Sequence, residues 1–154
     1  FSTLHTNDAP STNTRLQNMG TPDYLISAAC QLVVAQRLAR KNCKDCRVPD
    51  DDVTPKALAD FGFTVEEASR AKAQKGEGCN ECKSSGYKGR MGIYEILSVS
   101  KPIKEAILAK ATTPELKAIA MKEGFRTMQD MGRELILTGD LNFREYDRVL
   151  STEG

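Results

Sequence analysis

Four of the five cysteines form two Cys-x-x-Cys pairs, a spacing that lets two short turns present four sulfur atoms to one metal ion. Cys43 and Cys46 lie in "NCKDCR", and Cys79 and Cys82 lie in "GCNECK" after an interval of 32 residues, 47–78. Four thiolates suit the tetrahedral coordination of Zn²⁺. Because every ligand position is a cysteine, no coordination position remains for a substrate. We therefore expect a structural zinc ion rather than a catalytic one.

Three other uses of these cysteines are less well supported: a redox pair, a disulfide framework, and a site for another metal or a metal cluster. A thioredoxin-like redox pair lies at the start of a helix that follows a strand, and neither pair has that context. A disulfide framework is typical of secreted chains, and nothing in the sequence marks this chain as secreted. Cys30 lies in an apolar segment and is expected to be a small buried residue.

Basic residues near the pairs would lower the thiol pKa values and offset the negative charge of a zinc–thiolate centre. These are Lys41, Lys44, Arg47, Lys83 and Lys88.

The single histidine, His5, lies in the polar stretch "STLHTND". Residues 1–4 are predicted to end a buried strand, and a helix is predicted to follow. Ligands of open α/β sheets bind at this kind of strand end, where an imidazole could orient a water molecule or contact a phosphate. Arg15, Arg37 and Arg40 carry guanidinium groups suited to phosphate. The alternative is that the histidine and each arginine are ordinary surface or core residues.

Two helices are predicted before the first cysteine pair. Asp8 is expected to cap the first, which has Pro10 in its first turn and ends near Met19 with Gly20. The second is predicted over residues 22–40, because its apolar residues roughly follow i, i+3, i+4, i+7 spacing. They are Leu25, Ile26, Ala29, Leu32, Val33 and Leu38, and Gln36 occupies a further position of the series.

The interval between the cysteine pairs exceeds the usual 15–20 or so residues of a zinc ribbon, and two short helices account for the excess. The Thr-Pro pair at 54–55 opens the first, and Gly62 ends it. A capping box of Thr64 and Glu67 opens the second, which is expected to end near Gln74.

After the second pair, "GRMGIYEIL" (89–97) is predicted to be a strand, and the rest of the chain is predicted to be helical. The four helices begin near Pro102, Thr113, Thr127 and Asn142. In the last of them, Phe143, Tyr146 and Leu150 form an apolar stripe. The stripe either contacts a partner or packs on the chain's own core.

Length and composition are those of one globular domain, or one domain with a small appendage. The 154 residues include 22 basic and 21 acidic side chains, so net charge gives no argument for binding nucleic acid or a membrane surface. The weakly polar segment 24–35 is too short to span a bilayer, and no signal peptide precedes it. The chain begins with Phe1 rather than Met, which is expected of a piece cut from a longer protein.

Three segments together resemble a known family. They are "STLHTNDAPSTNTRLQNMG", "AQRLARKNCKDC" and "GCNECKSSGYKGRMGIYEIL". In this order they are similar to the C-terminal third of the extension ATPases of type IV pilus assembly. Those ATPases belong to the secretion-ATPase superfamily, which also includes the type II secretion motor. The resemblance covers essentially all of residues 1–154.

The resemblance implies an α/β fold, namely the C-terminal part of a RecA-like ATPase domain with a tetracysteine zinc insert and a helical C-terminal end. Residues 1–42 would belong to the ATPase core, residues 43–95 to the zinc subdomain and residues 96–154 to the helical subdomain. His5 would lie near the γ-phosphate of ATP. Thr3, Thr6, Asn7 and Arg15 would assist in nucleotide binding. Cys43, Cys46, Cys79 and Cys82 would be the zinc ligands.

The resemblance also implies partners and a location for the intact protein. It would be a homo-hexamer in the cytoplasm, peripheral to the inner membrane, without direct membrane insertion or nucleic-acid binding. It would act on an inner-membrane platform protein that adds pilin, and pilus regulatory proteins would bind it.

One departure from the family pattern limits these expectations. The sequence contains no G-x-x-x-x-G-K-[ST] phosphate loop and no acidic strand end suited to Mg²⁺. In the family these elements precede the matching segment, so ATP and Mg²⁺ are expected only in the intact protein. This chain alone is expected to bind ATP weakly, if at all, and not to hydrolyse it. The competing interpretations are a free-standing zinc ribbon for nucleic acid, which a 6% aromatic content without Trp disfavours, and a protein-interaction module.

Overall fold

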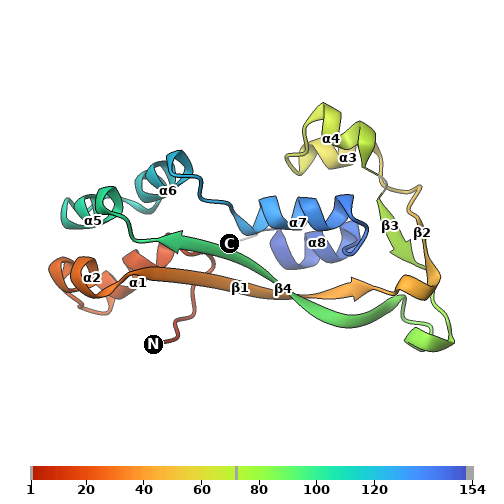
Figure 1. The fold of residues 1–154 in the computed structure, drawn as a ribbon, viewed down its shortest axis with the longest axis horizontal. Helices are drawn as coiled ribbons and strands as arrows, with labels where there is room; N and C mark the ends of the chain where they lie inside the picture. Colours follow the sequence, from red (N-terminus) through yellow and green to blue (C-terminus); the bar gives the residue numbers. More distant parts are fainter. Residues whose placement is uncertain (1, 72, 152–154) are drawn as a thin grey trace. The chain divides into compact units, whose positions relative to one another are not determined.

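The structure, a computed structural model, describes residues 2–71 and 73–151. This part of the chain contains eight α-helices and four strands, and the chain divides into two compact units. The first unit is Phe1–Gln36 with Tyr94–Thr127, and the second is Arg37–Ile93 with Met128–Gly154. Two long strands, β1 (Leu32–Asn42) and β4 (Tyr87–Ser98), pair with each other and run through both units (Figure 1). Among the described residues, no helix is long and apolar enough to cross a membrane.

The first unit is built from four helices and one end of the β1–β4 pair. Helix α2 lies beside α5, and α5 lies beside α6 (Figure 1). The bounds are Ser11–Asn18 for α1, Asp23–Ala29 for α2, Lys101–Leu108 for α5 and Thr113–Lys122 for α6. The core of this unit is aliphatic, with one phenylalanine. Its buried residues include Ile26, Leu97, Ile103, Ile107, Leu116, Ala120 and Phe125.

The second unit combines the cysteine-bounded insert with the last two helices. Strands β2 (Arg47–Pro49) and β3 (Gln74–Gly76), both labelled in Figure 1, pair antiparallel, with Val48 opposite Lys75. The insert between them carries helices α3 (Pro55–Asp60) and α4 (Val65–Arg70). Helices α7 (Met128–Leu137) and α8 (Phe143–Leu150) pack on each other. Their approach is close at Gly132, because a Cβ there would lie 2.6 Å from Cε2 of Tyr146.

The apolar stripe of α8 packs on the chain's own core. The ring centroid of Phe61 lies 4.7 Å from that of Phe143 and 5.9 Å from that of Tyr146, and both pairs are edge to face. Tyr146 and Leu150 are both 2% exposed. The suggestion that this stripe forms a partner surface is therefore wrong, and the alternative is confirmed.

Most predicted helix starts are confirmed by their capping contacts. Thr54 Oγ1 accepts a hydrogen bond from the N–H of Ala57, and the capping box of Thr64 and Glu67 is present. The predicted strand 89–97 lies within β4, and the four C-terminal helices begin within two residues of their expected positions. At the start of α1, the N–H of Ser11 donates to Asp8 Oδ1 at 2.8 Å.

The predicted helix over residues 22–40 is wrong in its second half. Helix α2 ends at Ala29, and "QRLAR" belongs to strand β1. Alternate residues of β1 point inward, but only Ala35 and Ala39 among them are fully buried, whereas Val33, Arg37 and Lys41 are half-buried. The predicted helical spacing used Leu32, Val33 and Leu38 here, and Leu32 and Leu38 are exposed on the other face of the strand.

Two smaller expectations also fail. Residues 2–4 are not in a strand, and Ser2 and Thr3 are exposed, while Phe1 lies outside the described residues. A strand requires a pairing partner, and in the described part of the chain β1 and β4 pair with each other. Cys30 is half-buried and follows the end of α2, because the helix is shorter than predicted.

Candidate functional site

The two cysteine pairs converge in the second unit. All four sulfur atoms lie within 4.8 Å of one another. The Sγ–Sγ distance is 3.9 Å for Cys43 and Cys79, 3.8 Å for Cys46 and Cys82, and 3.7 Å for Cys79 and Cys82. A tetrahedral ion with Zn–S bonds of about 2.3 Å would separate its sulfur ligands by about 3.8 Å. The arrangement therefore fits a four-coordinate zinc ion.

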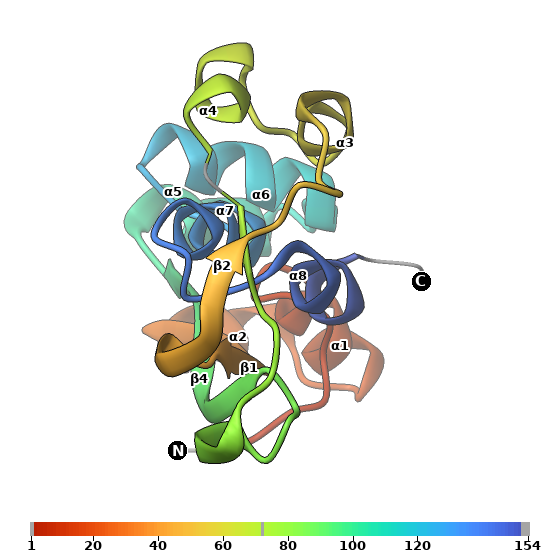
Figure 2. The same cartoon turned by 90° about the vertical axis from the view of Figure 1, so that its right-hand side faces the viewer.

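Each pair lies on a short 3₁₀ turn next to a strand. One turn spans Lys44–Cys46 and leads into β2, and the other spans Asn80–Cys82 after β3 (Figure 2). Backbone N–H groups point at the sulfur atoms. The N–H of Gly78 lies 3.3 Å from Cys46 Sγ, and Cys82 Sγ accepts from the N–H of Cys79 at 3.1 Å. Such bonds stabilise thiolates, so the turns are suited to the charged form of the ligands.

Three of the thiols have shifted pKa values that differ from one another. Burial raises the pKa of the Cys43 thiol and raises that of Cys46 to about 12. Burial also disfavours the thiolate of Cys82, but the N–H groups of Cys79 and Gly86 donate to its sulfur and lower its pKa to about 6. Cys82 therefore gives up its proton to an arriving cation more readily than Cys43 or Cys46 does.

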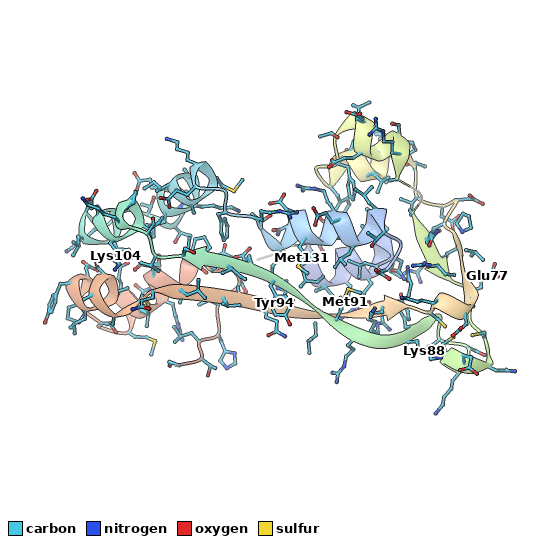
Figure 3. All side chains as sticks on the ribbon, in the orientation of Figure 1. Glu77, Lys88, Met91, Tyr94, Lys104 and Met131 are labelled. Carbon is cyan, nitrogen blue, oxygen red and sulfur yellow. The ribbon has the colours of Figure 1, made fainter. Side chains whose placement is uncertain are left out.

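A lysine connects the two turns outside the sulfur cluster. Lys88, labelled in Figure 3, donates to Asp45 of the first turn at 3.3 Å and to Glu81 of the second at 3.0 Å. Each carboxylate immediately precedes the second cysteine of its pair. Of the five basic residues expected near the cluster, Lys88 thus joins the turns through their acidic residues.

A buried asparagine that the sequence analysis did not identify supports the first turn. Asn42, the last residue of β1, is 2% exposed and immediately precedes Cys43. Its Nδ2 donates to the carbonyl groups of Gln74 and Gly139, both at 2.9 Å. Its Oδ1 accepts from Asn142 Nδ2 at 2.9 Å. These partners lie far away in the sequence, so local spacing could not have revealed them.

Arg40 forms hydrogen bonds with a residue of α8. The fully buried carboxylate of Glu145 accepts from the backbone N–H of Arg40 at 2.8 Å and from its guanidinium at 2.6 Å. Arg148 donates to the same carboxylate. Burial opposes ionisation of Glu145, but these arginine bonds lower its pKa to about 2. The guanidinium of Arg40 lies 4.1 Å from the ring centre of Tyr87, and Arg37 donates to the carbonyl of Val149.

His5 lines a shallow hollow of about 290 Å³ in the first unit. We call this the histidine hollow; its lining residues are His5, Thr6, Asn7, Ser11, Thr14, Arg15, Asn18 and Thr113. Four of these, His5, Thr6, Asn7 and Arg15, were predicted from the sequence, whereas Thr3 is exposed and is not among them. One lining residue, Thr113, comes from a distant part of the sequence, and its Oγ1 lies 2.8 Å from that of Thr14.

Comparison with known proteins identifies the family. The family model described as type II/IV secretion system protein matches residues 1–148. The chain belongs to this family. Its relatives include the type IV pilus assembly ATPase PilB of Acinetobacter baylyi, 39% identical over 153 residues. The PilB of Thermus thermophilus is 40% identical over 148 residues, and the type II secretion system protein E of Aeromonas hydrophila is 32% identical over 149 residues.

The type II/IV secretion system proteins to which the chain is similar are much longer than it. The match to the Acinetobacter baylyi PilB covers 98% of this chain and 26% of that relative. For the Thermus thermophilus protein the shares are 94% and 16%, and for the Aeromonas hydrophila protein 97% and 29%. The family membership inferred from the quoted segments is thus confirmed.

Proposed function

We propose that this chain is the C-terminal part of a hexameric motor ATPase that powers type IV pilus assembly. The motor couples ATP hydrolysis to the addition of pilin through an inner-membrane platform protein. The observation that carries this proposal is the gradient of similarity. PilB proteins are 37–40% identical to the chain, whereas the type II secretion relatives are 32–35% identical.

In this proposal the four cysteines bind one structural zinc ion. Cys43, Cys46, Cys79 and Cys82 supply four sulfur ligands with spacings close to those of tetrahedral coordination. A bound zinc ion would supply the positive charge that keeps the four thiols ionised. The site then stabilises the fold of the second unit and takes no part in ATP chemistry.

The nucleotide chemistry is assigned to a phosphate loop and Mg²⁺-binding residues outside this chain. His5 is the residue of this chain that would approach the γ-phosphate, with Thr3, Thr6, Asn7 and Arg15 assisting. The presence of His5 and Arg15 in one hollow supports this role, because imidazole and guanidinium groups both bind phosphate. Residues 1–42 then serve the ATPase core, residues 43–95 the zinc subdomain and residues 96–154 the helical subdomain.

The intact motor is proposed to act in the cytoplasm at the inner membrane, as a homo-hexamer that neither enters the bilayer nor binds nucleic acid. The platform protein and pilus regulatory proteins are its partners. Arg37 and Arg40 support the fold through α8 and are not assigned to phosphate.

A chimera tests this proposal. The matching segment of the Pseudomonas aeruginosa PilB, 149 residues that are 37% identical, is replaced by this chain. The chimera is expected to hydrolyse ATP in a phosphate-release assay and to restore surface pili in cells without PilB. A matched chimera with His5→Ala is expected to form hexamers but to lose most turnover. A chimera that forms hexamers and binds zinc, yet neither hydrolyses ATP nor restores pili, would contradict the proposal.

A further inference from the structure

Strand β4 buries a carboxyl group in an apolar row. Ile93 and Leu97 point inward and are 0% and 4% exposed, whereas Tyr94 and Ile96 are exposed on the other face (Figure 3 labels Tyr94). Glu95 occupies the inward position between the two aliphatic residues and is 3% exposed. Burial of a carboxyl group is unfavourable unless it has hydrogen-bond partners. Its partners therefore indicate what it does.

One partner of Glu95 is the turn that follows the histidine. Glu95 Oε1 accepts a hydrogen bond from the backbone N–H of Ala9 at 2.5 Å, across 86 residues of sequence. Ala9 is fully buried, so without this acceptor its N–H would lack the solvent that usually satisfies a turn. The next residue, Pro10, is also buried and has no N–H. The bond thus fixes the backbone four residues after His5.

The next two backbone donors, at the start of α1, are satisfied locally. The N–H of Ser11 donates to Asp8 Oδ1 at 2.8 Å, and the N–H of Thr12 donates to the carbonyl of Ala9 at 3.2 Å. Thr6 Oγ1 lies 3.0 Å from Thr12 Oγ1. These contacts shape the turn, but they lie within it and α1. The carboxyl of Glu95 connects the turn to β4.

We infer that Glu95 is the positioning residue of the histidine turn, residues 5–10. By accepting the N–H of Ala9 it fixes this turn against β4, and so places His5 and the first turns of α1, including Arg15, at the histidine hollow. The consequence for ATP turnover rests on the proposed function. The placement of His5 does not, because it concerns the geometry of this chain alone.

The experiment uses NMR on the chain, uniformly labelled with ¹³C and ¹⁵N. In the wild-type protein, a scalar coupling across the hydrogen bond is expected between the Ala9 amide nitrogen and the Glu95 side-chain carboxyl carbon. Two variants then separate the hydrogen bond from packing. Glu95→Met keeps the length of the side chain and removes the acceptor, whereas Glu95→Gln keeps a carbonyl oxygen. Glu105→Met, at an exposed glutamate of α5, is the matched control.

In Glu95→Met, amide exchange at Ala9 is expected to accelerate by about 10- to 100-fold, and the ring signals of His5 are expected to shift. Glu95→Gln is expected to restore both, and Glu105→Met to change neither. Absence of the coupling in the wild-type protein would overturn the inference without requiring any variant to fold. So would Glu95→Met if it left Ala9 exchange or the His5 signals unchanged. None of these measurements involves ATP, so a failure of the pilus chimera leaves them unaffected.

Discussion

Asn42 and Asn142 bond side chain to side chain across 100 residues of sequence, with Asn142 Nδ2 donating to Asn42 Oδ1 at 2.9 Å. Both are buried. Asn42 precedes the first cysteine of the sulfur cluster, and Asn142 caps α8 by accepting the N–H of Glu145 at 2.8 Å. The sulfur cluster and the last helix are therefore connected through two neutral amides.

Replacement of Asn42 by alanine is expected to lower the free energy of unfolding by about 2–3 kcal/mol, because it leaves the carbonyl groups of Gln74 and Gly139 without their donor. Urea unfolding followed by circular dichroism measures this change. Asn18→Ala, at an exposed asparagine, is the control and should change stability by less than about 0.5 kcal/mol. A double-mutant cycle with Asn142→Ala should show coupling, and strict additivity would argue against the amide–amide bond.

Zinc removal is expected to loosen the second unit without unfolding the first. Metal analysis of the purified chain should find about one zinc ion per chain, and Cys82→Ser should abolish it. After a strong chelator is added, amide exchange should accelerate in residues 43–95 and remain slow in α5 and α6, which have their own aliphatic core. If the purified chain contains no zinc and the chelator leaves the spectrum of residues 43–95 unchanged, the metal assignment is wrong.

The buried carboxylate of Glu145 should make the free energy of unfolding depend on pH in the acid range. Its pKa is lowered from 4.5 to about 2, so its contribution is complete above about pH 4.5 and is lost as the pH falls through about 2. This difference corresponds to roughly 3 kcal/mol. Urea unfolding at a series of pH values should therefore show a steeper fall between pH 4.5 and 2 for the wild-type chain than for Glu145→Gln. Parallel curves for the two proteins would show that Glu145 is not the responsible group.

A methyl group at Gly132 should separate α7 from α8. The added carbon of Gly132→Ala would lie 2.4 Å from Leu150 Cδ1 and 2.6 Å from the Tyr146 ring, in a fully packed region. Alanine favours a helix by about 1 kcal/mol over glycine, but overpacking costs about 1–3 kcal/mol, so a net loss of stability is expected. Thermal unfolding measures it. The loss of stability caused by Gly132→Ala should be smaller when it is measured in a chain that already carries Leu150→Ala, since that change removes one of the two clashing side chains.

Local signals accounted for much of the fold. Thr54, the Thr64–Glu67 box and Pro102 each mark a helix start through contacts within four residues, and such contacts are visible in a sequence. Strand β1 was not predictable in this way, because its conformation depends on pairing with β4 more than 40 residues later. Leu32, Val33 and Leu38 gave a helical spacing, but the pairing with β4 overrides it and leaves Leu32 and Leu38 exposed.

The same difference between local and long-range contacts decides which parts of the candidate sites could be predicted. The cysteine spacing predicted the sulfur cluster, because each pair is a local turn. Asn42 gave no signal, since its partners lie 32, 97 and 100 residues away. Glu95 gave no signal either. Its burial marks it in the structure, but both of its neighbours, Tyr94 and Ile96, are apolar and exposed, so the sequence does not show that Glu95 points inward.

The β2–β3 pair has a consequence for chain length. Pro49 lies opposite Gln74, and the N–H of Asp50 donates to the carbonyl of Ala73 at 2.7 Å. These contacts hold the two ends of the insert side by side, and we call this closed base of the loop its neck. Once such a neck is formed, the entropy of closing the loop beyond it grows only with the logarithm of its length. Exposed residues just past the neck, such as Asp51 and Asp52, are therefore where added or lost residues would disturb the sulfur cluster least.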